Sequence, residues 1–169
     1  MEVTLEQLLE SRDRRHELQA SLLRRYPRMT LMCVTVVMPG KEKRNQYSLA
    51  IAKSAMYALR TATTPLHILF ERDLVTGYEA YVLSPMSPIE TKRLACRIEE
   101  SAPLGRLFDI DVIGKDGIPL SRESVGYGPR RCLLCDNDAR FCMRNHSHTQ
   151  EEVLNHIKQL VRECTTNTK

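Results

Sequence analysis

The run from Met29 to Met38 limits the fold of this chain more than any other stretch of its sequence. It is nearly all apolar and rich in β-branched residues, and the turn-forming pair Pro39-Gly40 follows it. A strand of this composition has no polar side to present to water, so it is typical of a position that is buried on both faces. The run therefore predicts the central strand of a sheet.

Helices and further strands surround this central strand. Each expected helix begins with a side chain that can cap its first turn, and Ser87-Pro88-Ile89-Glu90 is the clearest start because it joins a capping box to proline at the first helical position. We expect helices from Thr4 to Arg25, from Asn45 to about Thr61, from Ser87 to about Ser101 and from Ser147 or Thr149 to about Cys164. Strands are expected at Leu66–Glu71 and Tyr78–Leu83, around a turn at Asp73–Gly77, and at Gly105–Ile113.

From the central strand onward the order is strand, helix, strand, strand, helix, strand. This βαββαβ order predicts an α+β fold with one open mixed or antiparallel sheet, of the ferredoxin-like or nucleotidyltransferase-like kind. One helix precedes this unit, and a hairpin and helices follow it. The length of 169 residues suits a single domain. We expect residues 1–164 to form that domain and residues 165–169 to be a disordered tail.

Two carboxylates share one face of the last predicted strand. Apolar residues alternate with Asp109 and Asp111 there, so a strand would bury the first set and present both aspartates on its other face. Residues two apart on a strand lie about 6.5–7 Å apart at Cα. Carboxylates at that spacing can bind one Mg²⁺ together. The alternative is a half-exposed strand with an acidic face, because Asp-x-Asp is short and common.

The first helix carries a polar patch on its apolar side. At 100° per residue its leucines fall on one face, yet Arg12, His16 and Gln19 lie at the centre of that face and Arg15 lies at its edge. Because an unpaired buried charge is costly, these side chains must be paired or must line a cavity. The alternative is a helix that covers the domain only partly, with a solvated patch.

Two loops are basic. The loop at residues 39–44 carries Lys41 and Lys43 and can hold phosphate, although a plain turn has the same composition. A second stretch with little predicted regular structure contains Arg122, Arg130 and Arg131. The planar fork of arginine suits phosphate oxygens, so this stretch can close on a nucleotide beside the carboxylates. A solvated basic loop is the alternative.

Three cysteines, Cys132, Cys135 and Cys142, precede His146 and His148. Cys-x₂-Cys brings two thiolates to one tetrahedral metal, and a third cysteine with one histidine would complete a structural zinc site. Three alternatives stay open. Cys142 can be a small core residue on a helix, the Cys-x₂-Cys can be a redox pair, or all three can be buried reduced thiols.

Charge and hydropathy narrow the choice of partners. The chain has 25 basic and 21 acidic residues, a net charge of +4. This balance suits a phosphorylated small ligand or an acidic protein partner and is too small to argue for nucleic acid. No run of 18 apolar residues occurs, and the first residues lack the basic and apolar regions of a signal peptide. We therefore expect a cytoplasmic protein without a membrane or nucleic-acid partner.

Much of the chain resembles one known family. The specific resemblance lies in Gly105–Val112, Ser121-Arg122, Pro129–Cys135, Ala139, Cys142, Arg144 and His148. On these residues the chain resembles the citrate lyase holo-enzyme synthases, also called apo-citrate lyase phosphoribosyl-dephospho-CoA transferases. The first helix, with Leu8-Leu9, Arg12, Arg15 and Gln19, and the Pro39-Gly40 turn are also similar to the family, although Met38 and Lys41 differ from other members.

The resemblance implies a reaction of the nucleotidyl-transfer type. Members transfer the 2'-(5''-phosphoribosyl)-3'-dephospho-CoA group from its triphosphate precursor to a serine of the acyl carrier (gamma) subunit of citrate lyase, and they release pyrophosphate. It implies that Asp109 and Asp111 are catalytic and hold Mg²⁺, which would stabilise charge on the phosphoryl oxygens and the departing pyrophosphate. The residues expected to bind substrate phosphates are Arg12, Arg15, Gln19, Lys41, Lys43, Arg106, Arg122, Arg130 and Arg131.

Two other classes of protein fit parts of the sequence. A small zinc-containing module would recognise nucleic acid or protein through the basic residues 122–144. The low aromatic content, with no Trp and only three Phe, argues against base stacking. A thiol redox protein would need an exposed Cys132 with a lowered pKa.

Overall fold

The computed structural model describes residues 2–62 and 65–166 of the chain. Its centre is a sheet of four antiparallel strands in the order β2-β3-β1-β4. The strands are β1 (Thr30–Val36), β2 (His67–Leu74), β3 (Gly77–Ser84) and β4 (Phe108–Ile113). The helices are α1 (Leu5–Arg25), α2 (Gln46–Arg60), α3 (Pro88–Ser101), α4 (Ala139–Arg144) and α5 (Gln150–Thr166), with 3-10 turns η1 (Gly105–Leu107) and η2 (Glu123–Val125).

The predicted α+β fold and its βαββαβ order are confirmed. β1 pairs with β3 along one edge and with β4 along the other, so the apolar run supplies an inner strand of the open sheet. Four consecutive residues of β1, Leu31 to Val34, are at most 1% exposed. Burial on both faces explains why this strand shows no polar alternation.

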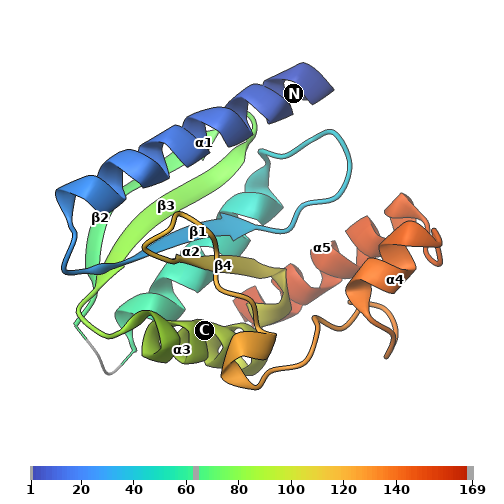
Figure 1. Ribbon diagram of the computed structural model, residues 1–169. Helices are drawn as coiled ribbons and strands as arrows, with labels where there is room; N and C mark the ends of the chain where they lie inside the picture. Colours follow the sequence, from blue (N-terminus) through green and yellow to red (C-terminus); the bar gives the residue numbers. More distant parts are fainter. Residues whose placement is uncertain (1, 63–64, 167–169) are drawn as a thin grey trace.

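Helices cover both faces of the sheet (Figure 1). On one face α2, α3 and α5 enclose the main apolar core, in which Val34 of β1 lies with Ile51 of α2 and Ile157 of α5. On the opposite face α1 packs across the strands, where Leu22 and Leu31 belong to a smaller apolar cluster. Since side chains alternate along a strand, each strand residue faces either the three-helix layer or α1.

The helix starts follow the predicted caps. Capping boxes are present at Thr4, Asn45 and Ser87. At the start of α5 the Thr149 hydroxyl accepts from the Glu152 amide, and the Glu152 carboxylate accepts from the Thr149 amide. Thr149 rather than Ser147 is therefore the cap of the last helix.

Two local predictions are wrong. The segment before β4 forms η1 rather than strand, because the Leu107 amide bonds back to the Leu104 carbonyl, and extended structure begins only at Phe108. The hairpin between β2 and β3 is also tighter than predicted. Leu74 pairs directly with Gly77, so two residues make the turn in place of five.

The disordered tail was predicted to begin at Thr165, but α5 extends to Thr166. Thr165 and Thr166 belong to α5, and both hydroxyls donate to the Arg162 carbonyl one turn back. The rest of that tail, residues 167–169, lies outside the described residues. The helical bonds of α5 thus continue past Cys164, where the apolar pattern of the sequence stops.

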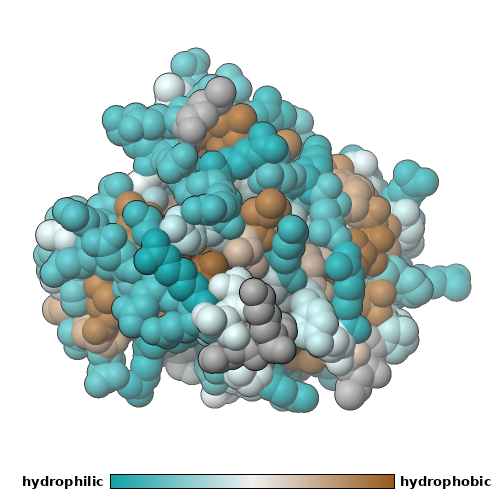
Figure 2. Space-filling model, turned by 180° about the vertical axis from the view of Figure 1, so that it is seen from behind, coloured by the Kyte–Doolittle hydropathy of each residue, from teal (hydrophilic) through white to brown (hydrophobic). Residues whose placement is uncertain are grey.

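Figure 2 shows the side of the molecule that faces away in Figure 1. Hydrophilic side chains cover most of it, and hydrophobic residues form small separate groups between them. Within residues 2–62 and 65–166, no helix is long and apolar enough to cross a membrane.

Candidate active site

The register of the sheet assembles polar side chains on the face that α1 covers. Asp109 lies opposite Thr35 of β1, and Asp111 lies opposite Cys33. On the other side of β1, Glu79 lies opposite Thr35 and Tyr81 lies opposite Cys33. Directly opposed side chains on one face have Cβ atoms about 4.5–5.5 Å apart. Two rows of side chains therefore cross three strands: Glu79, Thr35 and Asp109 in one, and Tyr81, Cys33 and Asp111 in the other.

The two aspartates differ in their hydrogen bonds. Asp109 accepts from the Arg130 guanidinium at 2.9 Å and from the Thr35 hydroxyl at 3.4 Å. The structure gives the Asp111 carboxylate no hydrogen bond from any described residue. Burial and the charge of Asp109 raise the pKa of Asp111, against the opposing charges of Lys92, Arg130 and Arg15. Asp111 is thus an acid whose charge is poorly compensated by the protein.

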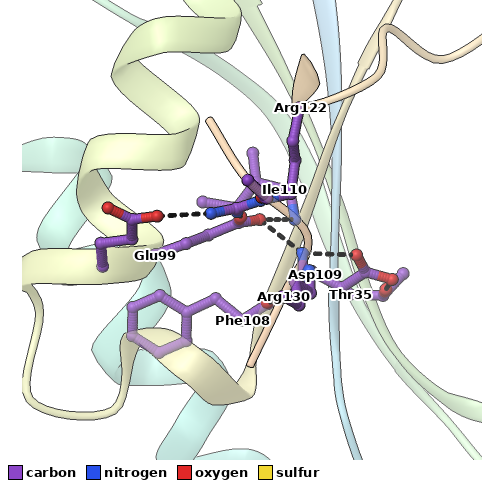
Figure 3. A network of polar contacts seen from close by, with 9 residues as sticks. Thr35, Glu99, Phe108, Asp109, Ile110, Arg122 and Arg130 are labelled. Carbon is purple, nitrogen blue, oxygen red and sulfur yellow. Dashed lines mark hydrogen bonds and ion pairs between the residues drawn. The ribbon is translucent and has the colours of Figure 1, made fainter. Parts of the chain in front are cut away.

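A buried glutamate organises the arginines beside β4. Glu99 of α3 is 3% exposed, and its carboxylate accepts from Arg130 at 2.7 Å, from Arg122 at 2.6 Å and from the Ile110 amide at 2.9 Å (Figure 3). Burial raises the pKa of Glu99, and Arg130, the Ile110 amide and Arg122 counter that rise. Glu99 therefore links α3, the edge of β4 and the arginine loop.

These contacts also close the outer edge of β4. The Phe108 carbonyl accepts from Arg130, the Ile110 amide donates to Glu99, and the Val112 carbonyl accepts from the Leu120 amide. An edge strand with unpaired backbone groups would invite further strand pairing. Here the loop that follows β4 satisfies these groups, and in doing so it places Arg130 next to Asp109.

The polar patch of α1 matches the prediction only in part. Arg12 and His16 are exposed, which contradicts their predicted place at the centre of the inward face. The inward side carries Gln19 and Arg15, as predicted, together with Ser11. The N-terminal end of α1 explains the error: Leu5 and Leu9 are 73% and 48% exposed, so they do not mark the inward side.

Arg15 and Gln19 face the two rows of polar side chains. Arg15 and Gln19 lie near the Cys33 thiol and oppose the effect of its burial on the pKa. Burial raises the pKa of Cys33 to about 12, so this thiol stays protonated. The Nε atom of Arg15 is buried and has no hydrogen-bond partner among the described residues. Arg15 thus brings an unsatisfied donor to the carboxylate face.

The predicted phosphate-binding lysines lie elsewhere. Lys43 donates to the Met38 carbonyl at 2.6 Å, which closes its own loop. Lys41 is exposed and lies 3.9 Å from Glu2. Lys41 also lines an open pocket of about 600 Å³ between this loop, the start of α2, and α5. Neither Asp109 nor Asp111 lines that pocket.

Arg106 and Arg131 flank the site without reaching the carboxylates. Arg106 donates to the Cys132 carbonyl, and Arg131 lies 3.7 Å from the exposed Asp136. Of the nine predicted phosphate-binding residues, the structure brings Arg15, Gln19, Arg122 and Arg130 to the carboxylates or their immediate partners.

The predicted Cys and His residues do converge. The sulfur atoms of Cys132, Cys135 and Cys142 and one ring nitrogen of His148 all lie within 4.8 Å of one another. His146 is exposed and adopts a positive φ of 48°, which turns the chain between α4 and α5. The sequence left His146 and His148 open, and the structure selects His148.

Three functional candidates were missed from the sequence. Lys92 and Glu99 of α3 are 4% and 3% exposed, and Glu79 of β3 is 3% exposed. Lys92 and Glu99 share a helix side with the buried Ala95 and Cys96, so charged residues at apolar spacing were the available signal. In β3 the residues on both sides of Glu79 are buried, and the Tyr81 hydroxyl donates to the Glu79 carboxylate at 2.5 Å.

An α+β domain that gathers carboxylates and arginines on one sheet face is suited to the transfer of phosphate-linked groups. Comparison with known proteins agrees with this class. The family model of apo-citrate lyase phosphoribosyl-dephospho-CoA transferase matches residues 3–164.

Named relatives cover nearly the whole chain. An apo-citrate lyase phosphoribosyl-dephospho-CoA transferase of Escherichia coli O1:K1 is 37% identical over 98% of this chain and 93% of its own length. A probable apo-citrate lyase phosphoribosyl-dephospho-CoA transferase of Streptococcus pyogenes serotype M18 is 32% identical over 94% of this chain and 85% of its own length. The protein CitXG of Haemophilus influenzae is 35% identical over 94% of this chain, which spans only 35% of that longer protein.

These matches define the chain as a transferase. It belongs to the apo-citrate lyase phosphoribosyl-dephospho-CoA transferase family, and the resemblance seen in the sequence is confirmed.

Proposed function

We propose that this enzyme transfers the phosphoribosyl-dephospho-CoA group from 2'-(5''-triphosphoribosyl)-3'-dephospho-CoA to a serine of the acyl carrier subunit of citrate lyase, with release of pyrophosphate. The family supports the choice of substrates. The observation that carries the site is the pair Asp109 and Asp111, which share one sheet face beside Arg130 and Arg15.

The donor set of this site suits a hard divalent cation. Asp111 is a partly buried carboxylate with a raised pKa and no hydrogen-bond donor among the described residues, so a cation would supply the compensation that the protein lacks. Asp109 and Asp111 would hold Mg²⁺, which when bound supplies Lewis-acid stabilisation of phosphoryl oxygens. Asp109 keeps its orientation through Arg130 and Thr35.

The arginines have distinct proposed roles. Arg15 brings its unsatisfied Nε donor toward the carboxylate face from α1, where it can bind a phosphate oxygen of the precursor. Arg130 and Arg122 are already held by Glu99, so they orient the loop and add positive charge to the site. An arrangement that is fixed before the substrate binds stabilises developing charge without reorganisation.

The same proposal covers the partners and the compartment. The acyl carrier subunit provides the serine nucleophile, and the precursor provides the transferred group. No disulfide joins the cysteines of the described chain, which fits the reducing cytoplasm where we place the reaction. Zinc, the other ion considered from the sequence, has no part in this step. Its proposed ligands are Cys132, Cys135, Cys142 and His148.

Intact-mass spectrometry tests the function. The purified protein is incubated with apo acyl carrier subunit, the triphosphate precursor and Mg²⁺. The carrier mass should rise by that of one phosphoribosyl-dephospho-CoA group, and a Ser→Ala change at the modified serine of the carrier should abolish the gain. An unchanged carrier mass, with a control transferase of the family active on the same substrates, would overturn the proposal.

A further inference from the structure

A second group of metal-ligating side chains lies in the segment between β4 and α5. Its members follow the spacing Cys-x₂-Cys-x₆-Cys-x₅-His, at Cys132, Cys135, Cys142 and His148. Cys132 and Cys142 are 7% and 5% exposed, whereas Cys135 and His148 are half-buried. We propose that these four residues bind one zinc ion in a structural site that is separate from the paired aspartates.

The distances between the ligand atoms match a tetrahedral site. With Zn–S bonds of about 2.3 Å and a Zn–N bond of about 2.0–2.1 Å, tetrahedral geometry separates two sulfurs by about 3.8 Å and a sulfur from a nitrogen by about 3.5 Å. The Cys135 and Cys142 sulfurs are 3.5 Å apart, and the His148 Nε2 atom is 3.3 Å from the Cys135 sulfur. The remaining pairs lie at most 4.8 Å apart, so relative shifts of about 1 Å or less would place all four atoms around one ion.

The backbone is already folded around the first two cysteines. The Cys132 amide donates to the Asn137 carbonyl at 2.7 Å, and the Ala139 amide donates to the Arg130 carbonyl at 2.8 Å. These two hydrogen bonds close a tight loop, which brings the Cys132 and Cys135 sulfurs to within 4.8 Å of each other.

Apolar packing does not account for the position of α4. The helix has six residues, and its two largest apolar side chains, Phe141 and Met143, are 54% and 70% exposed. Its buried residue is Cys142, which points at the sulfur cluster. A helix this short is not stable by itself. A metal bond through Cys142 would fasten α4 to the loop and to His148, in place of the apolar contacts that the segment lacks.

A disulfide explains fewer of these contacts. A bond between Cys135 and Cys142 would require their sulfurs to move from 3.5 Å to about 2.05 Å. It would also leave Cys132 and His148 gathered at the same point without a chemical reason. Zinc uses all four side chains, and the absence of any disulfide among the described cysteines agrees with that use.

The proposed ion would also hold the arginine loop, a consequence that rests on the proposed function. Arg130 lies two residues before Cys132, and Arg106 donates to the Cys132 carbonyl. Arg130 in turn contacts Glu99 and Asp109. Zinc would therefore act as a positioning element for the carboxylate site and would touch no substrate.

Metal analysis of the full chain, purified without chelators, tests the site directly. We expect about one zinc per chain in the wild type. Cys135→Ser and Cys142→Ser should lose it, whereas the matched control Cys164→Ser, a change on α5, should keep it. A second matched pair uses the two histidines: His148→Ala should weaken zinc retention against a competing chelator by at least about tenfold, and His146→Ala should leave it unchanged.

Two further measurements test the zinc site even if a variant fails to fold. Cobalt added to metal-stripped wild type should give the intense visible absorption of tetrahedral thiolate coordination, and His148→Cys should retain a metal ion that His148→Ala loses. A wild type with no zinc that also gives no tetrahedral cobalt spectrum would overturn the site. A Cys135–Cys142 disulfide in the wild type as purified without chelators, with no zinc bound, would also overturn it. Zinc content does not depend on transfer activity, so failure of either proposal is visible separately.

Discussion

Glu99 and Arg130, which come from α3 and from the loop after β4, meet at 2.7 Å at the edge of the sheet. The same Arg130 nitrogen lies 2.9 Å from Asp109, so a buried glutamate on α3 sets the position of a proposed metal ligand (Figure 3). The acidic pair on β4 is thus supported from the side by an ion-pair network, whose other residues lie outside the Asp-x-Asp pattern.

Glu99→Gln should lower both stability and transfer. The change keeps the shape of the side chain and leaves Arg122 and Arg130 without their buried counter-charge. Breaking a buried pair costs about 3–5 kcal/mol. Burial raises the pKa of Glu99, which offsets part of this cost, and Arg130 is partly exposed, so we expect a loss at the lower end, about 3 kcal/mol, or a Tm decrease of about 6–12 °C. Thermal unfolding measures it. Glu100→Gln, at an exposed partner of Arg122, is the control and should change Tm by less than about 2 °C. Equal losses in the two variants would contradict the role of Glu99.

Asp111→Asn should leave the protein at least as stable as the wild type at neutral pH. Burial and Asp109 raise the pKa of Asp111 in the folded protein, so the folded state binds this proton more tightly than the unfolded state does. The free energy of unfolding therefore falls as pH rises from about 3.9, the usual value for aspartate, through the raised pKa. Asp111→Asn has no carboxylate at this position, so its free energy of unfolding does not fall for this reason. Chemical unfolding of both proteins across that interval measures the difference, and a marked destabilisation of the variant at neutral pH would argue for a structural role.

Mg²⁺ should stabilise the wild type and not Asp111→Asn. A ligand that binds only the folded state raises Tm, by about 2–4 °C per kcal/mol of binding energy for a domain of this size. Binding requires the ionised carboxylate, so the raised pKa of Asp111 should make the Mg²⁺ effect disappear on acidification at a pH above that of an ordinary aspartate. Equal Tm shifts in both proteins would place the cation elsewhere.

Arg15→Ala should weaken binding of the triphosphate precursor more than Arg12→Ala does. Arg15 faces the carboxylates with an unsatisfied buried Nε atom, whereas Arg12 is exposed on α1. A charge-assisted hydrogen bond contributes about 1.5–3 kcal/mol, so affinity should fall by about 10- to 100-fold. Calorimetric titration of the precursor compares the two variants. A larger loss for Arg12→Ala would show that the substrate binds along the exposed side of the helix.

Local signals explain why much of the fold was predictable. The apolar run around β1 is stable only where both of its faces are buried, so it marks an inner strand. Each capping box is made by residues three apart in the chain, so it can be recognised without knowledge of the rest of the fold. The side of α1 that faces the sheet was predicted less well. Its orientation depends on where the helix extends beyond the sheet, and the exposed Leu5 and Leu9 gave a misleading apolar face.

The acidic pair and the cysteine cluster could be predicted from local sequence patterns, whereas the residues that hold them in place could not. Alternation along β4 identified Asp109 and Asp111, and the spacing of Cys132 and Cys135 identified the cluster. Glu99 lies on the buried side of α3 beside Ala95 and Cys96, and its contacts appear only when the fold brings the β4 edge and the arginine loop together. Choosing His148 over His146 likewise required the turn at His146.

The rate of carrier modification by Asp111→Asn tests the central claim most directly. Wild type, Asp111→Asn and the control Asp13→Asn, an exposed position on α1, are compared at equal concentration by intact mass with saturating precursor and Mg²⁺. Loss of a metal-binding carboxylate should cost several kcal/mol of transition-state stabilisation, so Asp111→Asn should be at least about 100-fold slower while folded, and Asp13→Asn should match the wild type. A folded Asp111→Asn enzyme that modifies the carrier within about threefold of the wild-type rate would contradict catalysis at the paired aspartates.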